Sequence, residues 1–214
     1  MDEPSIINIS KKISKDTAVW PGDTPVQIES TGSKKEGGIV NVTTLRFSAH
    51  TASHADAPYH VVDEGKTLDQ LDLYPFWGLA QVVTVHKSDG PLLPEDFEGY
   101  DLSLAPRLLV RTPIGRLSYK EFPEAIPYPS PALSDFLVKA GIILYGTDAP
   151  SMDAIDSEDL PGHKALIKNK IAILEGLDLN LAKDGLYELS ALPLNIVGGD
   201  GSPVRAALRL LNES

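Results

Sequence analysis

The pattern of apolar and polar residues predicts a chain made mainly of short strands. Alternating or β-branched runs, which are typical of strands, lie at residues 6–10, 26–30, 39–49, 78–86, 107–112, 142–147, 171–175, 187–194 and 204–210. Residues 133–140 have helical periodicity, with Ser130 as a candidate N-cap before Pro131 and Gly141 as the stop. Because this helix directly precedes a buried strand, the order favours parallel pairing and an α/β fold.

The segments between these runs are less regular. Residues 164–170 form a second helical candidate, whereas residues 113–131 contain five prolines and should form no long element. Residues 31–38 read as a hairpin-like connection, and residues 198–203 as a loop. The chain has no repeat, low-complexity tract or convincing linker, so we expect residues 1–214 to form a single domain.

Composition narrows the class of protein. The formal net charge of −11 argues against nucleic acid or an anionic membrane as a partner. The absence of cysteine excludes disulfides, thiolate metal sites and a cysteine nucleophile. The acidic N-terminus does not resemble a signal peptide, and no apolar run reaches the ~18 residues of a membrane span. We therefore expect a cytoplasmic protein.

One eleven-residue stretch concentrates the candidate chemistry. Three of the five histidines lie in residues 50–60, H-T-A-S-H-A-D-A-P-Y-H, and His50, His54, Asp56 and His60 all occupy even positions. Even positions share one face of a strand, but a straight strand of this length spans about 33 Å. Metal ligands lie at about 2.0–2.2 Å, so the segment must curl if these groups share an ion. Imidazole and carboxylate together favour zinc or a similar divalent ion.

The number of candidate ligands exceeds what one ion needs. His163 and Glu175 add two groups to the four of the cluster, which is too many for one tetrahedral ion. Either some of these groups are catalytic, or two ions share Asp56 as a bridge. A single buried histidine is more often a hydrogen-bonded core residue, but three histidines and an aspartate this close together favour a metal site.

A second candidate is the aromatic residue of the turn-rich segment V-W-P-G-D-T-P, residues 19–25. Pro21 and Gly22 force a change of direction directly after Trp20. Trp20 could fill the core beneath the loop or form an aromatic wall for a substrate. Composition alone favours the core position.

The residue 50–60 stretch resembles the signature H-T-G-T-H-x-D-A-P-x-H of the cyclase-like metal hydrolases, and within them the bacterial kynurenine formamidases (arylformamidases). Supporting segments follow in order along nearly the whole chain: W-P-G-D-T-P at 20–25, N-V at 41–42, His163 and Glu175, A-L-P-L at 191–194, and D-G-S-P-V-R-A at 200–206. The first motif is highly specific, and the order and spacing of the others strengthen it.

The resemblance implies a swivelling β/β/α-type fold with a central mixed sheet, and a role for each site residue. His50, His54 and Asp56 would hold one zinc, and Asp56 would also reach a second zinc held by His163 and Glu175. Manganese or another divalent ion could replace zinc. His60 would transfer protons, although a third ligand or a ligand-orienting residue is the alternative.

The resemblance also implies an activity and an assembly. It points to an arylformamidase that hydrolyses N-formyl-L-kynurenine to L-kynurenine and formate in tryptophan degradation, and Trp20 would contact the aryl formamide substrate. A homodimer or homotetramer is implied as well. The alternatives are hydrolysis of isatin, another cyclic amide or a lactone on the same site, or metal binding without turnover.

The chain departs from the family pattern in the metal-binding loop and beside Glu175. Ala52 and Ser53 replace glycine and threonine, and Gly176 stands where the family usually has asparagine. Because alanine adopts positive φ only at a cost, we expect Ala52 to have an ordinary backbone conformation. We expect metal binding to survive these changes.

Overall fold

The computed structural model describes residues 6–211, and its largest element is a mixed sheet of nine strands. In sheet order the strands are β1 (Ile6–Asn8), β13 (Ala207–Leu210), β11 (Gly185–Ser190), β5 (Trp77–Thr84), β7 (Arg107–Arg111), β9 (Leu144–Thr147), β10 (Ala172–Glu175), β4 (His54–Asp56) and β12 (Gly201–Pro203). The four central strands, β5, β7, β9 and β10, pair in parallel, and the flanking strands pair antiparallel. The predicted α/β class with a central mixed sheet is confirmed.

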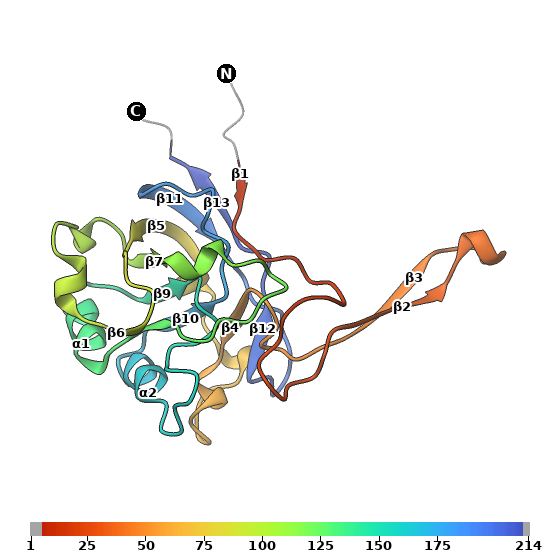
Figure 1. Ribbon diagram of the computed structural model, residues 1–214, viewed down its shortest axis with the longest axis horizontal. Helices are drawn as coiled ribbons and strands as arrows, with labels where there is room; N and C mark the ends of the chain where they lie inside the picture. Colours follow the sequence, from red (N-terminus) through yellow and green to blue (C-terminus); the bar gives the residue numbers. More distant parts are fainter. Residues whose placement is uncertain (1–5, 212–214) are drawn as a thin grey trace.

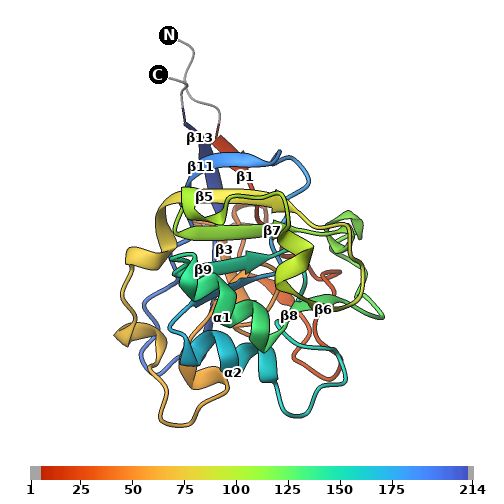
Figure 2. The same cartoon turned by 90° about the vertical axis from the view of Figure 1, so that its left-hand side faces the viewer.

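Two α-helices lie side by side on one side of this sheet (Figure 2). They are α1 (Pro131–Lys139) and α2 (Pro161–Lys168). The Ser130 hydroxyl accepts a hydrogen bond from the Leu133 amide at 3.1 Å, which confirms the predicted N-cap. Helix α2 begins earlier than residues 164–170 suggested, so His163 lies inside its first turn. No helix among residues 6–211 is long and apolar enough to cross a membrane.

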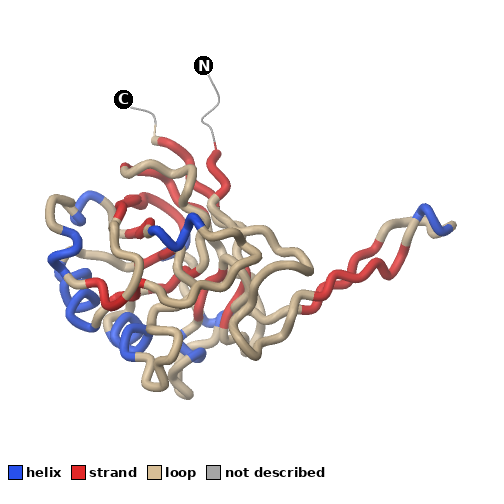
Figure 3. Tube along the Cα trace, viewed as in Figure 1, coloured by secondary structure: helices blue, strands red, loops and turns tan. Residues whose placement is uncertain are grey.

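The remaining elements are short. The 3-10 helices are η1 (Lys34–Glu36), η2 (Pro58–His60), η3 (Leu68–Gln70), η4 (Tyr74–Phe76), η5 (Pro94–Phe97), η6 (Leu102–Leu104) and η7 (Pro113–Arg116). Strands β6 (Gly90–Leu92) and β8 (Pro127–Pro129) pair in parallel in a separate ribbon. Figure 3 shows that loops make up much of the chain around the sheet.

The central strands bury apolar side chains on both faces. In β7, Leu108 and Val110 pack with Leu133 and Leu137 of α1. Leu109, between them, belongs to a second core that is formed by the opposite face of the sheet. Burial on both faces explains why these strands read as continuous apolar runs rather than as clean alternation.

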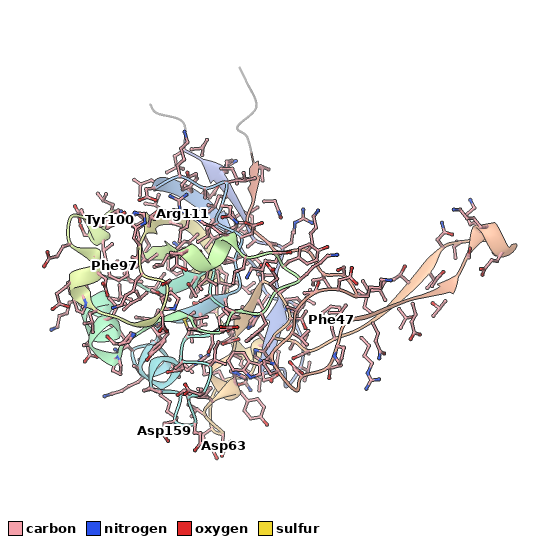
Figure 4. All side chains as sticks on the ribbon, viewed as in Figure 1. Phe47, Asp63, Phe97, Tyr100, Arg111 and Asp159 are labelled. Atoms are coloured by element: carbon pink, nitrogen blue, oxygen red, sulfur yellow. The ribbon has the colours of Figure 1, made fainter. Side chains whose placement is uncertain are left out.

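Strands β2 (Gln27–Gly32) and β3 (Val42–Arg46) form a hairpin that extends away from the body of the molecule (Figure 1). All five residues of β3 are exposed, and the strand is shorter than the predicted strand 39–49. Phe47, labelled in Figure 4, lies where the hairpin meets the body. The alternating apolar and polar residues of β3 therefore reflect its pairing with β2 in the hairpin, and they do not place β3 in the central sheet.

Two sequence predictions near the C-terminus are wrong. The strand predicted over residues 187–194 ends at Ser190. Residues 201–203, predicted as part of a loop, form the edge strand β12, which pairs Pro203 with His54. A three-residue Gly-Ser-Pro strand has no apolar periodicity to reveal it, and proline is tolerated there because an edge strand needs no donor on its free side.

Candidate metal centre

Adjacent strands place two of the predicted ligands side by side. Antiparallel pairing of β4 with β10 sets His54 directly opposite Glu175, and Asp56 faces the same side of β4 as His54. His163 approaches from the first turn of α2. The loop before β4 carries His50. All of these residues except His50, which is partly exposed, are buried.

The carboxylate of Asp56 faces three histidines, and that of Glu175 faces two. Asp56 Oδ1 lies 3.0 Å from His50 Nδ1 and 3.3 Å from His54 Nε2, whereas Asp56 Oδ2 lies 3.4 Å from His163 Nε2. Glu175 Oε2 lies 3.1 Å from His54 Nε2, and Glu175 Oε1 lies 3.1 Å from His163 Nε2. Asp56 lies between His50 and His54 on one side and His163 on the other, and Glu175 also joins His54 to His163.

Hydrogen bonds on the far side of two rings determine which nitrogen faces the centre. His54 Nδ1 donates to the Ala52 carbonyl at 3.1 Å, and His163 Nδ1 donates to Asp153 Oδ2 at 2.6 Å. In the neutral form of each ring, Nε2 then carries a lone pair directed at the carboxylates. A carboxylate or carbonyl that accepts from the outer nitrogen of a histidine is the usual partner of a metal-binding ring.

The buried polar atoms at the centre fit a divalent cation. Four of them have no hydrogen-bond partner: His54 Nε2, Asp56 Oδ2, His163 Nε2 and Glu175 Oε1. Buried acceptors without a donor are costly, and lone pairs facing one another raise that cost. A cation among them removes it, and nitrogen and carboxylate oxygen are the donors that zinc and similar ions take in proteins.

The pKa shifts of the same groups show that positive charge stabilises the centre. Burial disfavours the charged form of Asp56, but His163, His50 and His54 outweigh it and hold the pKa of this carboxyl well below its usual range. Burial likewise opposes charging of His54, yet Asp56 and Glu175 raise its pKa to about 10. Either protons or a metal ion can supply this positive charge, so the two compete for the same ligand atoms.

His60 lies at the open side of the centre. Its ring centroid is 4.0 Å from that of His50, and its Nδ1 is 3.9 Å from Asp200 Oδ2, which is also 3.1 Å from His50 Nε2. Burial lowers the pKa of His60, which keeps the ring neutral and able to accept a proton. Donor atoms of Asp56, His60 and His163 lie within 4.8 Å of one another, so a ligand role also suits the geometry.

A cavity of about 400 Å³ opens onto the centre. His50, His60, His163 and Glu175 line it on one side, and Trp20 lines it from the loop after β1. Trp20 is half-buried and packs edge-on against Phe122, with ring centroids 5.3 Å apart. Trp20 thus forms an aromatic wall of the cavity, and the position beneath the loop that composition favoured is wrong.

Two acidic residues of the centre, Asp153 and Asp200, were not predicted from the sequence. Asp153 accepts from His163 Nδ1 and also from the backbone amides of Gly162 and His163, at 2.6 and 3.0 Å. Asp200 contacts both His50 and His60. Asp153 lies outside every predicted element and motif, and Asp200 begins a segment that only supported the family resemblance. Their distance from the histidines along the chain left no local signal.

The backbone at Ala52 differs from the expectation. Its φ is 59°, in the left-handed region, so the predicted ordinary conformation is wrong. The chain must turn sharply between His50 and the start of β4 for both rings to reach Asp56, and the Ala52 carbonyl accepts from His54 in this conformation. This turn therefore costs about 1–2 kcal/mol of backbone strain at Ala52.

Comparison with other proteins places the chain among relatives of nearly equal length. The kynurenine formamidase of Salinibacter ruber is 46% identical over 206 residues, which cover 96% of this chain and 97% of the relative. That of Geobacillus thermodenitrificans is 44% identical over 205 residues, covering 95% and 96%.

Solved structures share the fold. One described as a potential metal-dependent hydrolase with cyclase activity superposes with a TM-score of 0.83 at 23% identity, covering 97% of this chain and 98% of the other. An isatin hydrolase bound to the product analogue thioisatinate gives a TM-score of 0.80 at 19% identity, covering 96% and 92%. The sequence pattern of the family described as putative cyclase matches residues 7–154. The chain belongs to the cyclase family and groups with its kynurenine formamidases.

Proposed function

We propose that this protein is an arylformamidase that hydrolyses N-formyl-L-kynurenine to L-kynurenine and formate in tryptophan degradation. The observation that carries the proposal is the set of buried, unpartnered nitrogen and oxygen atoms of His54, Asp56, His163 and Glu175 beside an aromatic-walled cavity. Relatives at 41–46% identity over nearly the full chain are named kynurenine formamidase, which supports the same substrate.

Five residues would hold the metal, as two Zn²⁺ per subunit or as Mn²⁺ or another divalent ion in their place. His50, His54 and Asp56 would bind one ion, and Asp56, His163 and Glu175 the other. The two-sided approach to Asp56 supports this division. Bound ions would polarise a carbonyl group and make water a stronger acid at neutral pH.

The chain's own side chains would position the substrate and move the proton. Trp20 and Phe122 would hold the aryl ring so that the formyl group lies beside His60. His60 would take a proton from the water that attacks the formyl carbon. It would return that proton to the aryl nitrogen as the C–N bond breaks, which releases formate and the free aromatic amine.

We also propose a domain organisation, a cellular location and an oligomeric state for the protein. Residues 1–214 would form one domain, and the protein would act in the cytoplasm as a homodimer or homotetramer. Exposed apolar side chains on the β2–β3 hairpin, among them Ile28 and Leu45, support an oligomer in which the hairpin lies against a second copy. A two-stranded hairpin alone in water is at best marginally stable, so a partner surface would explain its length.

The test is a metal analysis combined with a substrate panel of N-formyl-L-kynurenine, isatin and simple formanilides. Appearance of the kynurenine absorbance band with the first substrate, lost on chelation and restored by a divalent ion, is the expected result. Faster turnover of isatin would favour the cyclic-amide alternative. Bound metal with no turnover of any substrate would indicate a metal-binding protein without this activity.

A further inference from the structure

Lys11 brings a positively charged side chain into the cavity beside the metal centre. It follows β1 and lines the same cavity as Trp20, His60 and Glu175. Among the described residues that line this cavity, Lys11 supplies the lysine or arginine side chain, and histidines supply the other basic groups.

The backbone of Lys11 is held by the two segments that carry the metal ligands. Its amide donates to Ser53 Oγ at 2.9 Å, and that hydroxyl donates to the Gly176 carbonyl at 2.6 Å. Ser53 precedes His54, and Gly176 follows Glu175. The position of the Lys11 side chain is therefore set relative to the site where the reaction would take place.

The ammonium group itself is only partly satisfied. Nζ donates to the backbone carbonyl of Asp148 at 3.2 Å. The Asp148 carboxylate is instead occupied by the amide and hydroxyl of Thr112, at 2.7 and 2.6 Å. Within residues 6–211, no carboxylate oxygen lies within the 4.0 Å of an ion pair from Lys11 Nζ. The carboxylates of Asp148 and Asp178 attract this ammonium from a distance. Because it forms no direct ion pair with them, it still gains free energy when an anion enters beside it.

We propose that Lys11 binds a carboxylate of the substrate. The enzyme would thereby favour aryl formamides that carry an α-amino-acid group over those that lack one. The inference rests on the proposed function. N-formyl-L-kynurenine has an α-carboxylate at the end of the molecule away from the formyl group, so one end can reach the metal centre while the other reaches a fixed cation. The cavity of about 400 Å³ is of the size that takes a small ligand of this kind.

The test compares two substrates that differ in the charged group. N-formyl-L-kynurenine carries the α-amino-acid group, and 2-formamidoacetophenone has the same aryl formamide and ketone without it. Lys11→Met should raise KM for the first at least about tenfold, the effect of losing a hydrogen bond to a charged group, with kcat little changed. KM for the second should change less than about twofold. Lys12→Met, which alters the exposed neighbouring lysine, is the matched control.

Binding of the product gives a readout that does not require turnover. By calorimetry, the wild type should bind L-kynurenine more tightly than 2-aminoacetophenone, and Lys11→Met should lose that preference while Lys11→Arg keeps part of it. If the wild type fails to hydrolyse N-formyl-L-kynurenine, the proposed function fails, and this comparison still decides the role of Lys11. Equal losses for both ligands in Lys11→Met, or no preference in the wild type, would overturn the inference.

Discussion

The Ala52 carbonyl lies directly over the α-carbon of Gly176, so that a β-carbon built on Gly176 would be 2.2 Å from the Ala52 oxygen. Both residues have positive φ, 59° at Ala52 and 61° at Gly176. One belongs to the loop that carries His50 and His54, and the other follows Glu175. The close backbone contact brings the two ligand-bearing segments together, and it requires a residue without a side chain at 176.

We expect Gly176→Ala to lower the free energy of unfolding by more than about 2 kcal/mol, because it adds a steric clash to the strain of positive φ. Urea unfolding of the metal-free protein at fixed concentration measures the loss. Gly99→Ala is the matched control, since Gly99 has a φ of 91° but nothing within 4 Å of its added β-carbon. Equal losses in the two variants would show that the contact with Ala52 adds nothing to stability.

Asp153 orients His163 without facing the centre itself. We expect Asp153→Asn to weaken metal affinity by about 10–100-fold, because the amide accepts less strongly from His163 Nδ1. Competition with a chelator of known affinity measures the change, and a thermal melt separates it from lost backbone contacts. Asp159→Asn is the control, because Asp159 is exposed at the lower edge of the molecule (Figure 4). Unchanged affinity in Asp153→Asn would contradict an orienting role.

We expect His60 to transfer protons and not to bind a metal ion. His60→Ala should reduce kcat by about 10²–10⁴-fold and leave metal content near that of the wild type. His86→Ala, at an exposed position two residues after the end of β5, should change neither quantity. If His60→Ala lost its metal, the residue would be a ligand instead.

The ionisation of His60 adds an expectation for the pH profile. The base must be neutral to accept a proton, and burial lowers its pKa below the usual value of about 6.5. The limb of kcat/KM assigned to His60 should therefore fall as the pH drops below about 6.5, and should be missing from the residual activity of His60→Ala. An unchanged limb in that variant would assign it to another group.

The hairpin offers a test of the proposed oligomer. Ile28 and Leu45 are cross-strand partners, exposed by 44% and 56%. Replacing them together, Ile28→Glu with Leu45→Lys, keeps a favourable cross-strand pair while removing the apolar surface. We expect this protein to sediment as a monomer at micromolar concentration, where the wild type forms oligomers. Thr44→Lys is the control, because Thr44 lies opposite Glu29 on the other face of the hairpin. A double variant that still assembles would contradict a role for the face that carries Ile28 and Leu45.

Much of the fold was predictable because local patterns and tertiary structure agree. The apolar runs of β5, β7, β9 and β10 are buried on both faces, and the cap of α1 is a local hydrogen bond of Ser130. Predictions failed where long-range pairing defines the element. Strand β12 exists only because β4 offers it a partner. The apolar alternation at residues 39–49 did not reveal that β3 leaves the body of the protein.

The sequence by itself determined the donor groups of the candidate centre. Histidine and aspartate spacing in residues 50–60 marked His50, His54, Asp56 and His60. The resemblance to a family then gave the further candidates His163 and Glu175 a place in the same centre. The structure brings all six together, and their individual roles stay proposals. Only the tertiary structure decided that Asp153 and Asp200 support these histidines, that Ala52 turns through a left-handed conformation, and that Lys11 enters the cavity. Local patterns encode the chemistry of a side chain, whereas its neighbours depend on strands and loops that meet from distant parts of the chain.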